Sequence, residues 1–241
     1  MSEQTVEAQA PAGAGKMGPF ARYFGIFTSP GRVFEHLKAR PSWLVILLLV
    51  AASIAILNIA FMSTQTGEEL ARQAVVEQVR GRGVTLSEEQ LDQQFMIQKI
   101  AAPVVMFIWF PLLSLIITTL VYLAFNILLG GDATFRQVFS ITSHVFPIVV
   151  LQALLTTGLI FMKNSLTANT SFAVFVPFLE QDNLVYMILR GFDIFFIWAF
   201  GLIALGTSKL YGFPGSKCAG VVFGIYGGIA ILIGVIRYML S

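Results

Sequence analysis

Residues 103–162 read PVVMFIWFPLLSLIITTLVYLAFNILL (103–129), GGDATFRQ (130–137) and VFSITSHVFPIVVLQALLTTGLIFM (138–162). Each apolar run is longer than the about 20 residues that a helix needs to cross the hydrocarbon core of a bilayer. The linking segment carries a Gly-Gly-Asp turn and is too short to form a domain. The stretch therefore predicts an antiparallel transmembrane hairpin, around which the rest of the chain is organised.

The overall composition is that of an integral membrane protein. Of the 241 residues, 56% are hydrophobic and 12% are charged, whereas soluble domains carry about 25% charged residues. The net charge of +2 is too small to imply a nucleic-acid partner. Cys218 is the single cysteine, which excludes an intramolecular disulfide and a Cys-x-x-Cys metal site.

The chain is predicted to be an all-α membrane bundle with one membrane domain over 19–241, after a disordered tail over 1–18. Five apolar segments are long enough to span, at about 43–62, 103–129, 138–162, 184–207 and 217–240. A polar helical excursion fills 63–102. The first residues contain no apolar core of a signal peptide, so insertion is expected to depend on the internal spans.

Residues 19–41 precede the first span and form an amphipathic segment. Phe20, Tyr23, Phe24 and Phe27 follow helical spacing, and Ser29-Pro30 is a helix-start signal. The segment is too charged to span, so we expect an interfacial helix. The alternative is a soluble helix that packs on a partner domain.

The excursion over 63–102 is predicted to contain two short helices. Thr66–Glu69 and Ser87–Gln90 have the spacing of capping boxes, and Arg80–Gly83 ends the first helix. The second helix is expected to run into the next span, and Pro103 is a candidate for a kink at that junction. The mixed charges fit a solvated helical cap; a binding surface is the alternative.

Basic residues before the first span predict the orientation. Five of them fall between residues 16 and 40, namely Lys16, Arg22, Arg32, Lys38 and Arg40. Positive residues next to the first span favour the cytoplasmic side. We therefore expect a multi-pass protein of the cell (inner) membrane, with the N-terminus in the cytoplasm and the C-terminus outside.

Three segments carry a resemblance to a known family. Phe24–Phe34 (FGIFTSPGRVF), the Phe135-Arg136-Gln137 that follows the Gly-Gly turn, and Phe192–Trp198 (FDIFFIW) resemble the Yip (Ypt-interacting protein) domain family. The likeness covers nearly everything after Pro19. It implies five transmembrane helices, a cytosolic N-terminus, and a role in membrane organisation rather than catalysis. Eukaryotic members associate with small Rab-type GTPases; that partner is not carried over, because the N-terminal tail is short here and the likeness is to bacterial members.

Polar residues inside spans are costly in hydrocarbon and usually face protein. Two sets recur at roughly four-residue spacing, Ser114, Thr118, Tyr122 and Asn126 in one span and Ser140, His144, Gln152 and Thr156 in the next. They predict either a polar path or ligand site, or hydrogen bonds between helices. If the hairpin turns near Ala133, Tyr122 is level with His144, Asn126 with Ser140, Thr118 with Ile148, and Ser114 with Gln152.

Two further sets of residues are candidates. Arg190 and Asp193 are three residues apart in the fourth predicted span and can pair on one helical face; a structural ion pair and a proton or substrate site are both consistent with this. Ser216, Gly220, Gly224 and Gly228 form a ladder of small residues on the fifth span. Such a ladder permits close helix packing, within the chain or between chains.

The sequence contains no catalytic motif such as a Walker loop or HExxH. His36 and His144 are far apart and do not by themselves indicate a metal site, and no cofactor is expected. We interpret the chain as a non-enzymatic membrane scaffold or adaptor that binds other membrane proteins, or itself, through its cytoplasmic face. The alternative is a small transporter or channel that uses the polar ladders and Asp193. A membrane-embedded enzyme ranks behind both, and no small-molecule ligand is indicated.

Overall fold

The computed structural model describes residues 17–81, 83 and 87–240, and the regular structure in this part of the chain is helical. The tail expected over 1–18 lies outside the described residues except for its last two. The helices are α1 (Pro19–Thr28), α2 (Pro30–Ala39), α3 (Leu44–Met62), α4 (Gln65–Gly81), α5 (Glu88–Tyr122) with a π-helical continuation (Leu123–Leu128), α6 (Phe135–His144), α7 (Pro147–Lys163), a 3-10 turn (Phe172–Phe175), α8 (Leu184–Gly191), α9 (Ile194–Tyr211) and α10 (Gly215–Leu240). The all-α prediction is confirmed.

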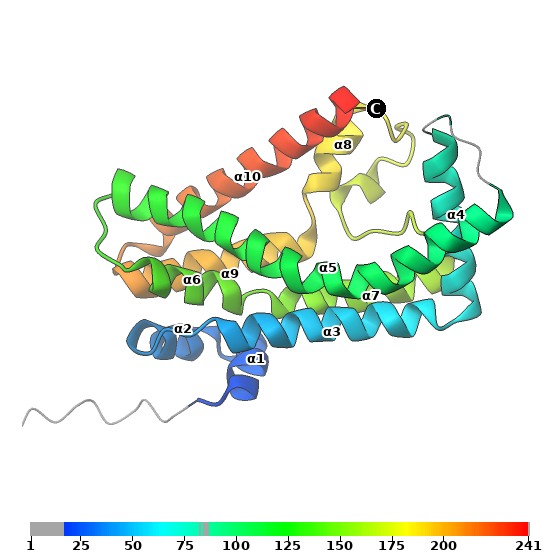
Figure 1. Ribbon diagram of the computed structural model, residues 1–241. Helices are drawn as coiled ribbons and strands as arrows, with labels where there is room; N and C mark the ends of the chain where they lie inside the picture. Colours follow the sequence, from blue (N-terminus) through cyan, green and yellow to red (C-terminus); the bar gives the residue numbers. More distant parts are fainter. Residues whose placement is uncertain (1–16, 82, 84–86, 241) are drawn as a thin grey trace, which may run out of the picture.

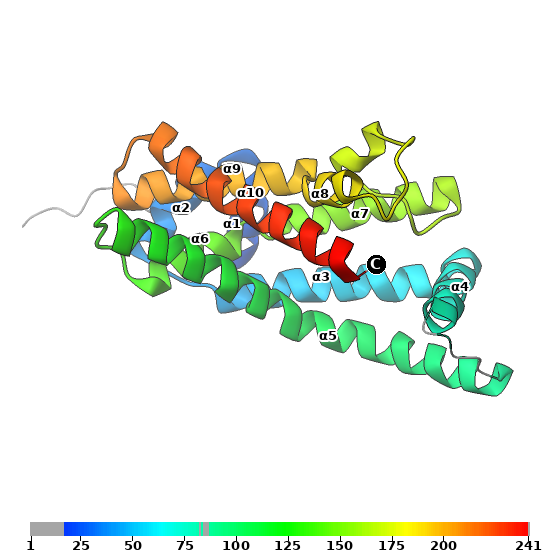
Figure 2. The ribbon, with the colours of Figure 1, turned by 90° about the horizontal axis from the view of Figure 1, so that it is seen from above.

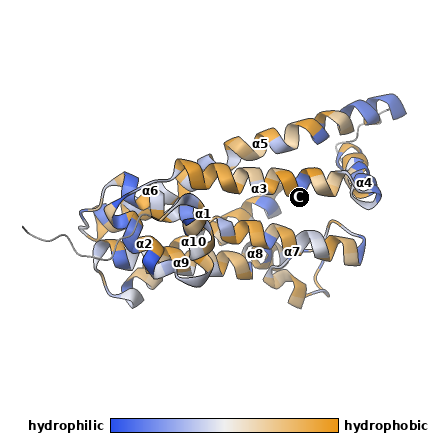
Figure 3. Ribbon diagram, turned by 90° about the horizontal axis from the view of Figure 1, so that it is seen from below, coloured by the Kyte–Doolittle hydropathy of each residue, from blue (hydrophilic) through white to orange (hydrophobic). Residues whose placement is uncertain are grey.

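Five helical segments are long and apolar enough to cross a membrane: Leu44–Met62, Glu88–Leu128, Phe135–Lys163, Ile194–Tyr211 and Gly215–Leu240. At most 44% of the most apolar window of each is buried inside the protein, so most of the apolar surface is left for lipid. Figure 3 shows apolar residues along the middle of the bundle and polar residues gathered at its ends. The protein is therefore a multi-pass membrane protein.

The bundle has two ends of different composition (Figures 1 and 2). At one end, here called the amphipathic end, α2 lies beside the turns over 129–134 and 212–214, and α1 follows it farther along the bundle, against α3. At the other, the capped end, lie α4, the first turns of α5, the loop over 164–183 and α8. The first span starts at the amphipathic end. Because the number of candidate spans is odd, the last one, α10, finishes at the capped end.

Helix α6 is the centre of the bundle and packs against α5, α9, α2 and α3. Every residue from Val138 to Phe146 is buried, including the polar ones. Helix α9 approaches it closely at Gly206, where a Cβ atom would lie 2.5 Å from Cγ2 of Ile141. A larger side chain at this position would separate the two helices.

The amphipathic segment divides into two helices with different surroundings. In α1, Phe20 and Phe24 are 66% and 63% exposed, as expected of an interfacial helix. In α2, Val33, Phe34 and Leu37 are fully buried, because this helix packs on α6 and α9. An interfacial position therefore stays a prediction for α1, and the apolar face of α2 belongs to the core.

Polar contacts hold α2 in place. Gln137 Nε2 donates to the Lys38 carbonyl oxygen at 3.0 Å, and Lys38 Nζ donates to the Lys209 carbonyl oxygen at 3.1 Å. Lys209 Nζ also donates to Glu35 Oε1 at 2.9 Å, and this hydrogen bond lowers the pKa of the Glu35 carboxyl. Gln137 completes a capping box with Thr134 at the start of α6. One glutamine thus both starts the central helix and anchors its neighbour.

Two predicted spans are interrupted. The third is divided at residues 145–146, because Pro147 has no N–H to continue the hydrogen-bond ladder, although α6 and α7 together still form one span. The fourth prediction, 184–207, is wrong as one helix. Helix α8 ends at Gly191, Phe192 is extended (φ −96°, ψ 95°), and Asp193 is the N-cap of α9. The span itself is Ile194–Tyr211.

The helix that begins after Ser87 runs into the second span as predicted. Ser87 Oγ accepts from Gln90 N at 3.3 Å, and Gln90 Oε1 accepts from Ser87 N at 2.9 Å, which confirms this capping box. Helix α5 continues through Pro103 as one element.

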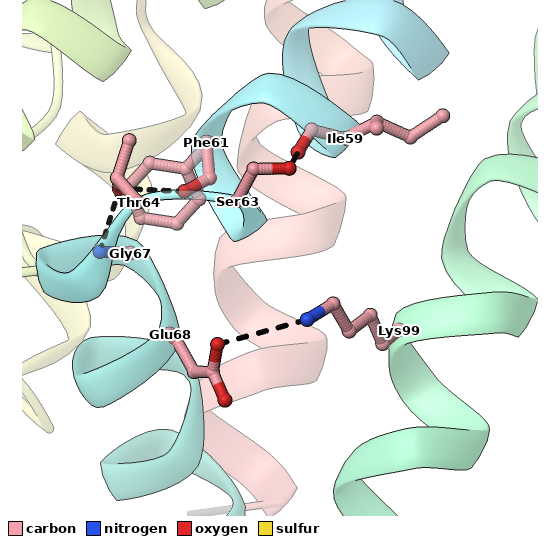
Figure 4. A network of polar contacts seen from close by, with 7 residues as sticks. All are labelled: Ile59, Phe61, Ser63, Thr64, Gly67, Glu68 and Lys99. Carbon is pink, nitrogen blue, oxygen red and sulfur yellow. Dashed lines mark hydrogen bonds and ion pairs between the residues drawn. The ribbon is translucent and has the colours of Figure 1, made fainter.

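The capping box predicted at Thr66–Glu69 is wrong, because α4 begins at Gln65 and the residue three after Thr64 is Gly67, which has no side chain to complete a box. Thr64 Oγ1, not Thr66, accepts from Gly67 N at 3.0 Å (Figure 4). A Cβ at Gly67 would collide with the Phe61 carbonyl oxygen, so the tight corner between α3 and α4 requires glycine there. An ion pair between Glu68 and Lys99 (3.6 Å) joins α4 to α5.

Candidate functional site

The polar residues at the middle of α5 face the central helix α6. Ser114 Oγ lies 2.9 Å from Ser143 Oγ, and Thr118 Oγ1 lies 2.5 Å from Thr142 Oγ1. None of the four side chains is more than 1% exposed. We call Ser114, Thr118, Thr142 and Ser143 the hydroxyl cluster. Its members satisfy one another, as in hydrogen bonds that join membrane helices.

The hydroxyl cluster corrects the predicted register of the hairpin. Thr118 was expected level with Ile148 and Ser114 level with Gln152, but their partners are Thr142 and Ser143. The prediction counted equal helical rises on both sides of Ala133. Residues 129–134 are not helical, and extended residues advance about twice as far as helical ones. Residues of α6 therefore come level with positions of α5 farther from the turn than predicted.

The predicted contact between Tyr122 and His144 is wrong. His144 Nδ1 lies 2.7 Å from the carbonyl oxygen of Ser140 in its own helix, and its Nε2 has no hydrogen-bond partner among the described residues. The Tyr122 ring instead packs edge-on against Phe135, with 5.5 Å between ring centroids. Both follow from the register, since Phe135 and not His144 opposes Tyr122.

Asn126 closes the turn between the second and third spans. Its Nδ2 donates to the Ala133 carbonyl oxygen at 2.7 Å, and its Oδ1 accepts from the Tyr211 hydroxyl at the end of α9. Asn126 lies in the π-helical segment, a geometry that often marks functional positions. The expected pairing with Ser140 is not formed, because Ser140 Oγ donates to the Arg136 carbonyl oxygen.

Gly130 and Gly131 of this turn are each required for a different structural reason. Gly130 has φ +70°, a conformation that glycine adopts without steric cost. At Gly131, a Cβ would lie 2.6 Å from the Tyr211 ring. The Gly-Gly pair thus lets the turn pack against the end of α9.

Asp193 is the centre of a second buried network, at the break between α8 and α9. The residue is 4% exposed. Its Oδ1 accepts from Phe195 N at 2.8 Å and its Oδ2 accepts from Thr170 Oγ1 at 2.5 Å. Its backbone N–H donates to the Tyr226 hydroxyl at 3.0 Å, and that hydroxyl donates to the Gly191 carbonyl oxygen at 2.9 Å.

This network joins four parts of the chain. Gln152 Nε2 of α7 donates to Thr170 Oγ1 at 3.5 Å, which connects α7 through the loop to α9 and α10. We call Gln152, Thr170, Asp193 and Tyr226 the Asp193 cluster. Sequence reasoning identified Gln152 and Asp193 but missed Thr170 and Tyr226; a hydroxyl in the polar loop and a tyrosine within a glycine-rich span were the available signals.

The predicted ion pair between Arg190 and Asp193 is not formed. Arg190 is exposed, and the ion pairs among the described residues join Arg72 to Asp92, Lys99 to Glu68 and Lys209 to Glu35. The prediction assumed one continuous helix. Because the helix breaks at Phe192, the two residues belong to different helices and do not share a face.

The small-residue ladder of α10 faces outward. Gly220, Gly224 and Gly228 are exposed, and an added Cβ would meet no atom within 4 Å. A packing role within the chain is therefore wrong for these three residues, and contact between chains stays a prediction. The glycines that permit close packing are Gly191, where a Cβ would lie 3.0 Å from Ala230, and Gly234, where it would lie 2.8 Å from Ile188. Both belong to the contact between α8 and α10.

Two cavities lie beside α1, and neither is lined by the hydroxyl cluster or the Asp193 cluster. An apolar groove of about 630 Å³ is lined by residues of α1, α3 and α7. A smaller cavity of about 400 Å³, here called the basic pocket, is lined by Met17, Arg22, His36, Arg40, Pro41, Ser42 and Arg136. Sequence reasoning missed the basic pocket, although Arg22, opposite the apolar stripe of α1, was a signal.

Among the described residues, no three histidine, cysteine, aspartate or glutamate side chains come together in an arrangement that could hold a metal ion. His36 and His144 lie on α2 and α6, and each is buried. The side chains of the hydroxyl cluster and the Asp193 cluster form hydrogen bonds with one another, whereas Asn58 Oδ1 and His144 Nε2 are buried without a partner among the described residues.

Comparison with known proteins identifies the family. The model of the Yip1 domain matches residues 24–237. The chain is also 30% identical over 222 residues to a Bacillus subtilis (strain 168) protein named "Membrane protein YknW", with 89% of this chain and 90% of the relative covered. No solved structure matches significantly. The three segments that resemble the Yip family all lie within residues 24–237. The chain belongs to the Yip1 domain family of membrane proteins.

Proposed function

We propose that this chain is a non-enzymatic scaffold or adaptor of the cell membrane. One observation carries the proposal: two clusters of polar side chains inside the bundle form hydrogen bonds among themselves. The hydroxyl cluster pairs α5 with α6, and the Asp193 cluster ties α7, α9 and α10 together. A transport path would require such groups to face a water-filled cavity, whereas the two cavities described above are lined by other residues.

The orientation belongs to this proposal. The amphipathic end is placed in the cytoplasm, because basic residues gather beside the first span. Cysteine substituted for Glu77 at the capped end, in a chain with Cys218 replaced, should react with an impermeant thiol reagent in spheroplasts. Cysteine at Asp132, in the turn of the amphipathic end, should react only after lysis. The reverse pattern would overturn the orientation.

The partner is proposed to be another membrane protein or a second copy of the chain. The outward ladder of α10 supports this, since small residues allow the backbone of a second helix to approach closely. Gly220, Gly224 and Gly228 have open space in front of them, which leaves this face free for a neighbour in the bilayer.

The direct test is a photo-reactive amino acid at Gly224 in native membranes. The matched control is Ile233, which is 41% exposed on the same helix and, nine residues after Gly224, lies about half a turn away from the ladder. The proposal expects a defined crosslinked species from Gly224 and only lipid adducts from Ile233. Equal adducts from both positions would contradict a specific contact through this face.

Transport is tested separately in reconstituted vesicles. The proposal expects proton and ion leakage equal to that of protein-free vesicles. A saturable flux that is lost in folded Asp193→Asn protein would contradict the scaffold proposal and would favour the transporter alternative.

A further inference from the structure

The basic pocket concentrates positive charge at the amphipathic end. Three of its residues are arginines and one is a histidine, and no carboxylate is among the lining residues. Arg22 comes from α1, His36 from α2, Arg40 from the link between α2 and α3, and Arg136 from the first turn of α6. Glu35, the acidic residue of α2, is bound to Lys209. Four segments of the chain thus bring basic side chains together, and no carboxylate lines the pocket to offset their charge.

Arg22 is the residue that packing alone does not explain. It is 9% exposed, its Nη1 donates to Ser42 Oγ, and its buried Nε has no hydrogen-bond partner among the described residues. Buried charges in proteins are ordinarily paired, because removal from water costs far more than a single neutral hydrogen bond returns. Burial accordingly lowers the pKa of the Arg22 guanidinium.

His36 is affected by the same excess of positive charge. It is 8% exposed, and its pKa is lowered by burial and by the charges of Arg22 and Arg40. Both effects disfavour the protonated form of His36. An anion in the pocket would offset the charge of Arg22 and would favour protonation of His36.

The geometry points to a phosphate group as the ligand of the basic pocket, with Arg22, Arg40 and Arg136 as the residues that hold it. Guanidinium groups offer planar pairs of N–H donors that match the oxygens of phosphate. A volume of about 400 Å³ accommodates a phosphate ester together with a small polar substituent. The uncompensated Arg22 Nε supplies a donor that no residue of the protein uses.

The position of the pocket allows two sources for that phosphate. Helix α1 carries Arg22 at the pocket, while Phe20 and Phe24 are exposed on its other side. An apolar face of this kind sets the helix at the boundary between acyl chains and headgroups, and basic pockets between membrane helices bind anionic headgroups. A soluble phosphate compound could reach the same end of the bundle from the water.

The test measures thermal unfolding of the full chain in a phosphate-free maltoside detergent. Two probes are titrated separately: inorganic phosphate and phosphatidylglycerol. We expect at least one to raise the unfolding midpoint in a saturable way. Arg40→Gln and Arg136→Gln should each weaken its apparent affinity by about tenfold, the loss expected for one charge-assisted contact. The control is Arg32→Gln, an exposed cation of α2 outside the pocket, which should change the affinity by less than about twofold.

The two probes separate the sources. A response to phosphatidylglycerol alone assigns the pocket to a lipid headgroup, and a response to inorganic phosphate assigns it to a soluble phosphate. Arg22→Gln should lose the response without losing stability in the absence of the probe, because an uncompensated buried charge is removed. If this variant does not fold, the affinities of Arg40→Gln and Arg136→Gln still test the inference. The absence of a saturable response to either probe, or equal losses in Arg32→Gln, would overturn the inference.

Discussion

The two polar clusters inside the bundle solve the same problem in different ways. The hydroxyl cluster lies between helices α5 and α6. Thr118 Oγ1 donates to the Ser114 carbonyl oxygen of its own helix at 2.6 Å, so Thr142 is the donor in the hydrogen bond between the two threonines. The Asp193 cluster lies at the break between α8 and α9, where the fourth span begins. Asp193 accepts from Phe195 N in the first turn of α9.

The difference follows from the chemistry of the side chains. A hydroxyl is both donor and acceptor, so it can use the carbonyl oxygen four residues earlier and remain within a helix. An ionised carboxylate is an acceptor only, and a helix interior has no free N–H to offer it. Free N–H groups occur at a helix N-terminus. A buried aspartate therefore favours a helix N-terminus, and the chain provides one because the helix breaks at Phe192, directly before Asp193.

The largest expected effect is at that break. Asp193→Ala removes the N-cap of α9 and leaves the Thr170 hydroxyl and Phe195 N–H without an acceptor, which should cost about 2–4 kcal/mol of unfolding free energy. Asp193→Asn keeps one oxygen and should cost less. Ser114→Ala, the matched change in the hydroxyl cluster, should cost about 1 kcal/mol. Thermal and denaturant unfolding in detergent measure all three. Similar losses for Asp193→Ala and Ser114→Ala would remove the distinction between the clusters.

The next effect concerns the helices that the Asp193 cluster holds together. Gly234→Leu should destabilise the contact between α8 and α10 by about 1–3 kcal/mol, the range for overpacking, because a Cβ there lies 2.8 Å from the backbone of Ile188. Gly224→Leu, on the same helix in open space, should leave the unfolding midpoint of the isolated chain nearly unchanged. The opposite order would restore the ladder as the internal packing face.

The smallest effect tests the hydroxyl cluster by double-mutant cycles. Thr118→Val and Thr142→Val should be coupled by about 0.6 kcal/mol, and by at most about 1.7, as for other hydrogen bonds between membrane helices. The control cycle pairs Tyr122→Phe with His144→Leu, which make no contact, and should give additive losses. Coupling in the control cycle and none between the threonines would contradict the observed register and would support the register predicted from the sequence.

Local signals in the sequence predicted much of the fold. The hairpin, the capping box at Ser87 and the long α5 follow from hydropathy, cap residues and length, which act over a few neighbouring residues. The polar ladder of α5 also faces α6, as helical spacing indicated. These predictions hold because they depend on the chain close to each residue.

The remaining features depend on residues distant in sequence. The register of the hairpin required the path of residues 129–134, which hydropathy does not give. The faces of α10 are set by the docking of α8, so Gly234 and not Gly224 is the packing glycine. The basic pocket combines Arg22 with Arg136, more than a hundred positions later, and only the fold brings them together.

The central claim is that the hydroxyl cluster and the Asp193 cluster are sealed inside the bundle, and water accessibility tests it most directly. In a chain with Cys218 replaced by alanine, Ser143→Cys and the exposed control Asp132→Cys are exposed to a small hydrophilic methanethiosulfonate reagent in open membranes. Ser143 is 0% exposed, so its cysteine should stay unmodified until the protein is unfolded, while the control reacts at once. Rapid modification of the folded Ser143→Cys protein would mean that the hydroxyl cluster lines a water-filled path, and the scaffold account would be wrong.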